Sequence, residues 1–440
     1  KLDMEKKKAI AKITLISILV ALLLVFSIIS FMPKNSAKGF AGFAGSITKG
    51  MDVEGGIYAS YTPSKLGTMT DEEFKDGIDS TFSRINSLIE QKGYEDARVY
   101  LGSDNKIRIE TANTDDAEEI LSLIGSGEFK IKVSSSSSAE TKISGKNVTA
   151  AFAMQDPSTY NWGTYIGFDE TGAEALSSIT ASAGSSTVYL YFYRGDSENY
   201  FFSLSVSSQI TNDFLFISSS TGSMTKEDAI DLAIQVSTGS FETVLSIDGN
   251  VYEISPSSGE ESLLGITIAG AVAVLFILII FGVVYRELGL MSILSILLFV
   301  GSALFFMQAI PVITLSVASL GAVLVGVILI SSLHVILLEK IKTEYQLGKK
   351  LKTSIKTGYK KSIAIISEIC GILAIISIVM YFICQGAMKS FSMIMIVCSI
   401  LSIIITLFFT YHLNWSYSIF NPSNAKRVNF TREENVDEIE

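Results

Sequence analysis

The groups best able to do chemistry in this sequence are a carboxylate and an imidazole inside strongly apolar stretches. Glu368 is the one acid within the apolar stretches of the C-terminal half, and His334 follows Ser331 and Ser332 in the stretch before it. A carboxylate in a bilayer costs roughly a few kcal/mol, so it generally faces a bundle interior or a water path. An imidazole changes charge near neutral pH. These four residues predict a proton or cation relay, with the serines supplying hydrogen bonds.

Two plainer interpretations of these residues stay open. Glu368 and His334 lie near the ends of neighbouring apolar stretches that are joined by one loop, so a hydrogen-bonded pair with a structural role would look the same in the sequence. Alternatively, a glutamate near the end of a membrane helix extends its carboxylate to the polar interface.

Other chemistry has little support in the sequence. It contains no phosphate-binding GK[ST] loop, HExxH, CxxC or GxSxG motif, and its two histidines and three cysteines lack metal-ligand spacing. We therefore predict no enzymatic activity, no catalytic residue, no cofactor and no metal site. The basic segment 339–361 lacks the interleaved aromatic residues typical of nucleic-acid binding, and it favours contact with anionic membrane lipids instead.

The composition indicates a membrane protein with a separate soluble part. Of 440 residues, 48% are apolar and 18% are charged, which excludes a disordered chain, a collagen-like fibre and a disulfide-rich scaffold. The net charge of −10 averages two unlike regions, because residues 34–262 carry 33 acids and 16 bases while the remainder is net basic. The three cysteines lie outside that acidic region, so disulfides do not hold it together.

Apolar runs predict six transmembrane helices. Residues 10–32 form the first, after a short N-terminal segment 1–9, and a cleaved signal peptide is the competing interpretation of this run. A five-helix bundle is predicted over 263–412. Its helices are 263–285, 290–307, 312–338, 362–384 and 391–412, with the basic loop 339–361 inside it and the tail 413–440 after it.

The distribution of lysine and arginine predicts the orientation of these helices. The N-terminus, Arg286 between the second and third spans, the loop 339–361 and the tail all fall on one side if the chain crosses six times. By the positive-inside rule that side is cytoplasmic. We therefore expect both termini to be cytoplasmic and residues 33–262 to form a large extracytoplasmic domain. The low cysteine use of that domain and the Lys/Ile/Ser-rich composition fit a bacterial cytoplasmic membrane.

That extracytoplasmic domain is predicted to have an α+β fold of two lobes, 50–133 and 145–255, joined by the five-serine run 134–138. The first lobe has the order β-α-β-β-α-β of a ferredoxin-like unit, with EFKIKV as its last strand. In the second lobe, VYLYFY alternates aliphatic or phenyl side chains with tyrosines. A half-exposed sheet and a polypeptide-binding edge or surface are both consistent with that alternation.

Short segments along the chain resemble the SecD protein translocase subunits of the resistance-nodulation-division superfamily. Residues 50–56, GMDVEGG, resemble the family's GLDLxGG motif through Gly50, Asp52, Gly55 and Gly56. GKNV followed by GFDETGA resembles its TGKDV…FxxxGA stretch. LEKI, which contains Glu339, is followed by GKKLKTSIKTGYKKSI, as in the family's FERIxEE…GKxxxxAIxxGFxxAF. Lys389 lies in AMKSF, which is similar to xVKGF.

The resemblance implies an accessory role late in protein export, drawing on the proton gradient. It implies three partners: a SecF-like subunit, the SecY-containing channel and an unfolded secreted polypeptide. In that family the fourth helix carries Asp-Ala-Asn, where this chain has Ser332-Leu333-His334, and Glu368 occupies the place of the aspartate in a second such group. His334 would then replace the missing aspartate as the protonated group. Two alternatives remain: a scaffold or polypeptide-binding subunit without proton coupling, and a small-molecule or lipid exporter.

Overall fold

The computed structural model describes residues 2–28, 49–65, 69–92, 94, 96–112, 117–124, 127–195, 197–218 and 224–420. They belong to two compact units. The helical unit comprises residues 1–54 and 256–440, and the sheet unit comprises residues 55–255. The end of the first predicted span at 29–32, residues 33–48 and the last twenty residues of the predicted tail lie outside the described residues.

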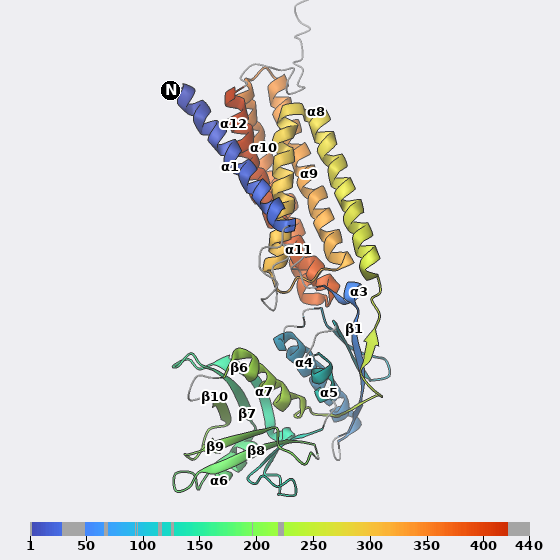
Figure 1. Cartoon of the computed structure of the whole chain (residues 1–440), viewed down its shortest axis with the longest axis vertical. Coiled ribbons are helices and arrows are strands. Elements are labelled where there is room, and N and C mark those ends of the chain that lie inside the picture. Colours follow the sequence, from blue (N-terminus) through green and yellow to red (C-terminus); the bar gives the residue numbers. More distant parts are fainter. Residues whose placement is uncertain are drawn as a thin grey trace, which may run out of the picture. The chain divides into compact units, whose positions relative to one another are not determined.

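The helical unit is built from long apolar helices that pack side by side (Figure 1). Its elements are α1 Leu2–Ile28, α3 Met51–Glu54, α8 Gly259–Ala309, α9 Val317–Gln346, α10 Leu351–Ile383, α11 Ala387–Ile404, the π-helical segment η2 Ile405–Phe409 and α12 Thr410–Phe420. Among the described residues, five helices are long and apolar enough to cross a membrane, with α11, η2 and α12 counted as one.

Helix α8 holds two of the predicted spans, 263–285 and 290–307. Its backbone leaves helical geometry at Arg286, where φ is 48° and ψ is −121°. A Cβ on Gly282 would lie 3.8 Å from Ile293 Cδ1, so the residues on either side of Arg286 face each other. The chain therefore reverses at Arg286, and Figure 1 shows the two limbs of α8.

The basic segment 339–361, expected to be a loop, is mostly helical, because α9 continues to Gln346 and α10 begins at Leu351. Leu351, Ile355 and Tyr359 recur every four residues and are buried in the core of the bundle, which gives this lysine-rich stretch an apolar helical face. The turn between the two helices contains Gly348, whose φ of 86° suits glycine.

Two other helix ends differ from the expected spans. Helix α9 begins at Val317 instead of 312, because Ser316 and Ser319 cap its N-terminus: each side chain accepts a hydrogen bond from the other's backbone N–H. At the other end of the chain, residues 413–420 of the expected tail continue the helix, with Leu413 and Tyr417 buried in the bundle core.

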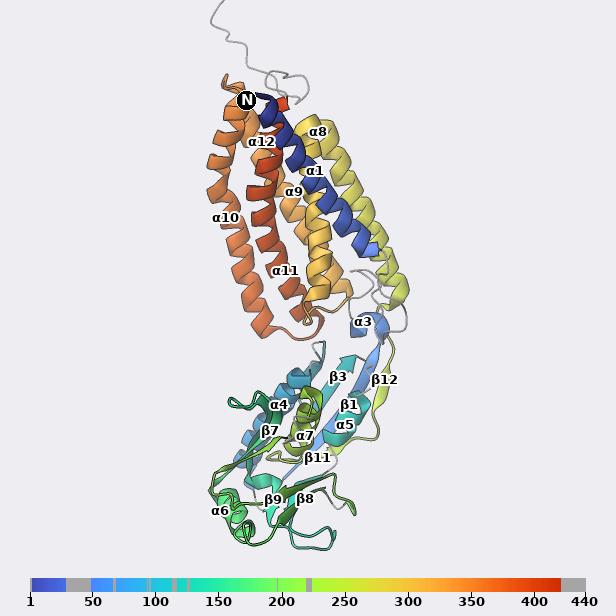
Figure 2. The ribbon, with the colours of Figure 1, turned by 60° about the vertical axis from the view of Figure 1, so that its left-hand side comes forward.

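The described residues of the sheet unit form three antiparallel sheets (Figure 2). The first has the order β11 (Val244–Ile247), β1 (Gly56–Ser64), β3 (Ile107–Ala112) and β2 (Arg98–Leu101), with β12 (Tyr252–Ile254) also paired to β1. The second has the order β10 (Phe214–Ser218), β7 (Trp162–Phe168) and β6 (Val148–Gln155). The third has the order β5 (Ile143–Ser144), β4 (Phe129–Lys132), β8 (Val188–Arg194) and β9 (Phe202–Val206).

In the described part of this unit, four α-helices pack against the sheets: α4 Asp71–Lys92, α5 Ala117–Ile124, α6 Glu170–Ile179 and α7 Lys226–Thr238, with a short 3-10 turn at Gly145–Asn147. Helix α7 serves two apolar cores, because Ile234 lies in the core beneath the first sheet while Leu232 and Val236 lie in the other. The tyrosine-rich strand β8 alternates as its sequence indicates, with Leu190 and Phe192 buried in that second core.

The division into lobes 50–133 and 145–255 does not follow the sheets. EFKIKV, expected to close the first lobe as its last strand, contains β4, which pairs with β5 and β8 instead. Its place beside β1 belongs to β11, from far along the chain. Phe129 and Ile131 are buried in the second core, which draws β4 away from the first sheet.

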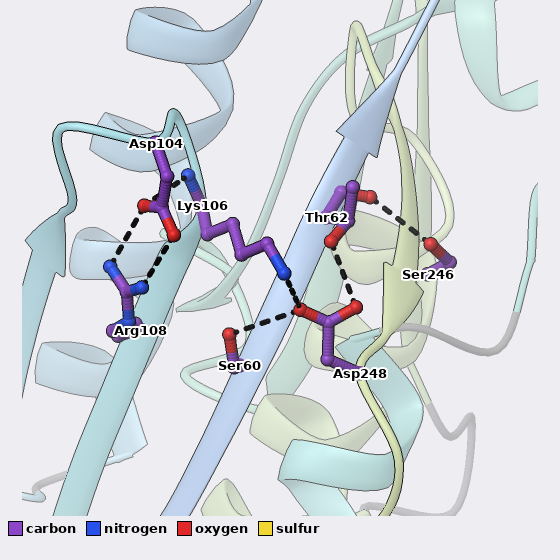
Figure 3. Close-up of polar contacts among 7 residues, drawn as sticks. All are labelled: Ser60, Thr62, Asp104, Lys106, Arg108, Ser246 and Asp248. Carbon is purple, nitrogen blue, oxygen red and sulfur yellow. Dashed lines mark hydrogen bonds and ion pairs between the residues drawn. The ribbon is translucent and has the colours of Figure 1, made fainter.

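Asp248, just after β11, fixes that strand to the first sheet (Figure 3). Its carboxylate accepts hydrogen bonds from Lys106 Nζ at 2.6 Å, Thr62 Oγ1 at 2.9 Å and Ser60 Oγ at 3.4 Å. The hydrogen bonds from Lys106 and Thr62 hold the pKa of Asp248 below its usual value. Strand β11, which lies far along the chain from β1, is thus held in register by residues of β1 and of the turn before β3.

Candidate functional site

His334 lies in the interior of the helical bundle. Its ring is fully buried, and the edge-on ring of Phe281 has its centroid 6.4 Å away. Nδ1 lies 2.7 Å from the carbonyl oxygen of Ile330, and Nε2 lies 3.0 Å from Thr410 Oγ1. Because a carbonyl oxygen can only accept, Nδ1 carries a proton, and in the neutral imidazole Nε2 accepts from the Thr410 hydroxyl.

Thr410 can serve either charge state of this imidazole. Its Oγ1 also lies 2.8 Å from Ser295 Oγ and 2.9 Å from the carbonyl oxygen of Ile405. If Nε2 gains a proton and donates to Thr410, the hydroxyl proton can turn to one of those two acceptors. Ile405 opens the π-helical segment, so the altered helical pitch brings its carbonyl to Thr410, five residues on. The arrangement can therefore hold a proton at Nε2 without leaving a polar atom unpaired.

Ser331 and Ser332 do not join this network. Ser331 Oγ donates to the carbonyl of Val327 at 2.6 Å, and Ser332 Oγ donates to the carbonyl of Ile328 at 2.8 Å. Both bonds stay within α9. Ser331 is buried, whereas Ser332 is exposed on the surface of the bundle.

Glu368 is likewise exposed, on helix α10, and within the described part of the chain no hydrogen bond or ion pair is found for its carboxylate. Its α10 neighbours Ile372 and Ile375 are 61% and 65% exposed, so the carboxylate stands on an apolar outer face of the helix. The structure therefore does not bring Glu368 and His334 together, and the predicted relay through both is not formed in this arrangement.

Ser332 and Glu368 nevertheless lie at the same level of neighbouring helices. Helices α9 and α10 run antiparallel, with a close contact between Gly358 and Ile341. Counting equal numbers of residues from that contact places Leu333 beside Ile366, and these two residues do share a buried cluster. The same count places Ser332 level with residue 367. The four predicted residues thus divide into an inward pair, Ser331 and His334, and an outward pair, Ser332 and Glu368.

Gly50 and Asp52 of the motif 50–56 lie where the chain leaves the helical unit for the sheet unit, and they hold the ends of neighbouring helices in place. Gly50 N–H donates to the carbonyl of Leu315 at 2.8 Å, and Asp52 Oδ2 accepts from the N–H of Val317 at 2.7 Å. The carbonyl of Asp52 also accepts from Ser258 N–H at 2.8 Å. This short motif therefore ties α3 to the first residues of α8 and α9.

The other motif residues have local structural roles. Gly55 has a φ of 84°, and Gly56 begins β1, where it pairs with both Ala112 and Ile254. Glu339 accepts from the hydroxyl of Tyr285 at 3.0 Å, which joins α9 to α8 near the turn at Arg286. Lys389 lies 5.6 Å from the ring centroid of Tyr381, across the turn between α10 and α11.

Sequence reasoning missed Ser295 and Thr410. Both are polar residues in long apolar runs, which is the signal that could have identified them. It grouped Ser332 with His334 in one relay, although two residues correspond to about 200° of rotation around an α-helix. Among the described residues, no three of His, Cys, Asp and Glu gather as metal ligands would.

Comparison with known proteins gives consistent results. No protein-family model matches the chain. The SecD protein translocase subunit of Sebaldella termitidis is 24% identical over 358 residues, which cover 79% of this chain and 83% of that protein. SecD of Alicyclobacillus acidocaldarius is 26% identical over 364 residues, covering 76% and 79%. SecDF of Bacillus subtilis is 24% identical over 363 residues, and this chain spans 47% of its length.

Solved structures share the fold. SecDF in its super-membrane-facing form matches 95% of this chain with a TM-score of 0.64 at 17% identity, and the match covers 59% of that protein. SecDF of Thermus thermophilus, described as a translocon-associated membrane protein, matches 95% of the chain with a TM-score of 0.54 at 16% identity. Several SecD proteins are similar to this chain along most of its sequence, so the chain resembles a divergent SecD-type protein translocase subunit.

Proposed function

We propose that this chain is an accessory subunit of the Sec protein-export translocon and assists late polypeptide translocation across a bacterial cytoplasmic membrane. The observation that carries the proposal is the extent of the similarity. It covers 79% of the chain in one SecD relative, which is more than either structural unit contains, so both units belong to the resemblance. A similarity to SecD in both units favours a role in protein export over a small-molecule or lipid exporter.

The proposed topology has six spans. Helix α8 has 51 residues, or about 77 Å at 1.5 Å per residue, whereas the hydrocarbon core is about 30 Å thick. Its two limbs on either side of Arg286 supply two spans, and the other four long helical segments supply one each. The positions of the lysines support a topology with both termini in the cytoplasm and the sheet unit outside. In a chain whose three native cysteines are replaced by serine, labelling of Ser136→Cys but not Lys350→Cys in intact cells by an impermeant maleimide supports this orientation, and the reverse result contradicts it.

The proposed proton site is the buried group of His334, Thr410 and Ser295. His334 takes up and releases the proton at Nε2, and the Thr410 hydroxyl turns between its acceptors as the charge changes. Glu368, which the sequence paired with His334, takes a different role in this proposal. Use of the proton gradient predicts that His334→Leu slows export of a reporter protein while the chain still reaches the membrane.

Glu368 and Ser332 support a partner subunit in the membrane. A carboxylate that faces hydrocarbon costs roughly a few kcal/mol, so an exposed Glu368 within a span calls for a polar partner on another helix. The chain spans about half the length of SecDF relatives, and we propose a SecF-like chain as this polar partner. We propose that the SecF-like chain packs against the outer surfaces of α9 and α10 where these two residues are exposed.

The remaining proposed partners are the SecY-containing channel, the unfolded secreted polypeptide and the surrounding membrane lipids. The experiment that tests the proposal is purification of the full chain from its native membrane in mild detergent, with the bound proteins identified by mass spectrometry. Recovery of a SecF-like chain and of SecY supports it. Their reproducible absence contradicts it.

A scaffold without proton coupling is the second candidate, because Glu368 lies apart from His334 and the fourth-helix aspartate of the family is a serine here. The two candidates make different predictions about export. The scaffold predicts that His334→Leu and Glu368→Gln both leave export unchanged, whereas removal of residues 55–255 abolishes it. The proton-coupled subunit predicts that His334→Leu slows export.

A further inference from the structure

The sheet unit contains a groove with a strand edge on one wall and a helix on the other. Its volume is about 250 Å³. The four consecutive residues 149–152 of β6 line one wall, while Ser83, Arg84, Ser87 and Leu88 of α4 line the other, with Ser237 of α7 between them. Successive residues of a strand face opposite sides of a sheet. A cavity that touches four in a row therefore runs along the edge of β6.

That edge directs backbone groups away from β7. Among the described residues, β6 pairs with β7 and with no other strand. Ser237 Oγ donates to the carbonyl of Ala151 at 3.0 Å, which shows that this carbonyl points away from β7. Backbone groups on a strand alternate in direction, so Ala153 also directs its N–H and C=O outwards. Residues 149–155 thus present an edge that an additional strand can join.

The groove is poor in charge. Arg84 is the charged residue among those that line it, and its guanidinium already donates to the carbonyl of Ser240 at 2.6 Å and to Ser240 Oγ at 3.1 Å. The remaining lining groups are hydroxyls, methyls and a phenyl ring. Recognition there depends on backbone hydrogen bonds more than on side-chain charges, so it tolerates many sequences.

An aromatic surface adjoins the groove at Phe152. The Phe152 ring stacks on Tyr165 with centroids 4.9 Å apart, and Tyr165 stacks on Phe214 at 5.3 Å. These side chains share the face of the β10-β7-β6 sheet that is opposite α7, and Phe152 is 36% exposed. A strand added to β6 would place every second side chain beside these rings, which favours apolar and aromatic side chains.

We propose that an extended, unfolded polypeptide binds in this groove as a fourth strand beside β6. The inference rests on the proposed function, since it assigns a binding site to the exported polypeptide. Pairing through the backbone gives affinity without a fixed sequence, and the rings beside Phe152 favour apolar segments, which unfolded chains expose. The opposite wall, α4, limits the groove to a single added strand.

The test uses the full chain in lipid nanodiscs and a fluorescein-labelled eleven-residue peptide of alternating valine and threonine, with binding followed by fluorescence anisotropy. Ala153→Pro removes an outward N–H, a position where an edge strand accepts proline. Ser87→Trp fills the groove from α4 without touching the sheet. We expect each to raise the dissociation constant about tenfold or more. The matched controls, Ala153→Val and Ser87→Ala, should change it less than about twofold.

A second peptide, with N-methyl groups on four central residues, distinguishes backbone hydrogen bonding from non-specific apolar binding. We expect it to lose binding to the wild-type chain. Equal binding of both peptides, unchanged affinity of the Ser87→Trp variant, or no binding of the unmodified peptide at millimolar protein overturns the proposal. If the Ala153→Pro variant does not fold, the Ser87→Trp variant and the methylated peptide provide the test of the proposed site. If peptide binding does not follow the proposal but SecY still co-purifies with these variants, the result overturns the proposed binding site and not the proposed function.

Discussion

Asp52 Oδ2 accepts a hydrogen bond at 2.7 Å from the backbone N–H of Val317, the first residue of α9. The chain passes from the helical unit to the sheet unit just after Asp52, at residues 54–55, and returns at 255–256, just before Ser258. Ser258 N–H donates to the carbonyl of the same Asp52. One residue therefore joins both connections of the sheet unit to the start of the helix that carries His334.

The Asp52 contact predicts a measurable effect on α9. Asp52→Ala removes the acceptor of an N-terminal amide and a negative charge at the positive end of the helix, which lowers stability by about 1 kcal/mol. Hydrogen exchange of residues 317–319 should accelerate in this variant. Asp52→Asn keeps an acceptor oxygen and serves as the control, with a smaller effect. Equal exchange in all three proteins would show that Ser316 alone caps the helix.

The separation of Glu368 from His334 predicts that the two residues act independently. Mutations at sites without shared partners usually add within about 0.5 kcal/mol, whereas members of one network do not. We expect the effects of His334→Leu and Glu368→Gln on export rate and on thermal stability to be additive in the double variant. A coupling energy above about 1 kcal/mol would restore the pairing that the sequence suggested.

The apolar spans and their order could be predicted from hydropathy, but the direction of each side chain could not. His334 and Glu368 lie near the same end of adjacent helices, as expected, yet helix rotation turns His334 inwards and leaves Glu368 outside. The rotation of a helix is decided by which of its faces packs best against neighbours. Here Leu333, Ile366 and Cys370 form that packed face.

Strand pairing in the sheet unit was harder to predict for a related reason. The strand EFKIKV was correctly predicted as extended, but its assignment to the first lobe was wrong. Its partner β8 and the strand that takes its place, β11, lie about 60 and 115 residues further along, beyond the reach of local patterns. The burial of Phe129 among residues of β8 and α7 decides the outcome.

Thr410 is predicted to stabilise the helical bundle through its hydrogen bond to His334. Thr410→Val is nearly isosteric and leaves the buried Nε2 of His334 without its partner, which costs about 1–3 kcal/mol. Thermal unfolding of the purified protein in detergent should show the loss. Ser332→Ala is the control, because that hydroxyl is exposed and bonds to its own helix. A variant at Thr410 as stable as the Ser332→Ala control would argue against the network.

Two glycines of α9 form another matched pair. A Cβ on Gly326 would lie 2.7 Å from Cys398 Sγ and 3.0 Å from Phe299 Cζ, whereas a Cβ on Gly321 would meet no atom within 4 Å. Gly326→Ala should separate α9 from α11 and destabilise the bundle by about 1–3 kcal/mol. Gly321→Ala should be neutral or stabilising, because alanine favours a helix by about 1 kcal/mol over glycine. Equal melting temperatures would mean that the helices are not packed this closely.

The Asp248 cluster predicts a pH dependence of the sheet unit. Hydrogen bonds from Lys106 and Thr62 lower the pKa of Asp248 in the folded chain relative to the unfolded chain. The folded state therefore binds the proton less readily, and the stabilisation is complete above the unfolded pKa of about 3.9 and is lost as pH falls towards the lower folded value. Asp248→Asn should reduce stability at pH 7 and flatten its fall below pH 5. The difference in melting temperature between this variant and the wild type should shrink on acidification. A difference that stays constant from pH 7 to pH 3 would mean that the charge of Asp248 does not hold β11 on β1.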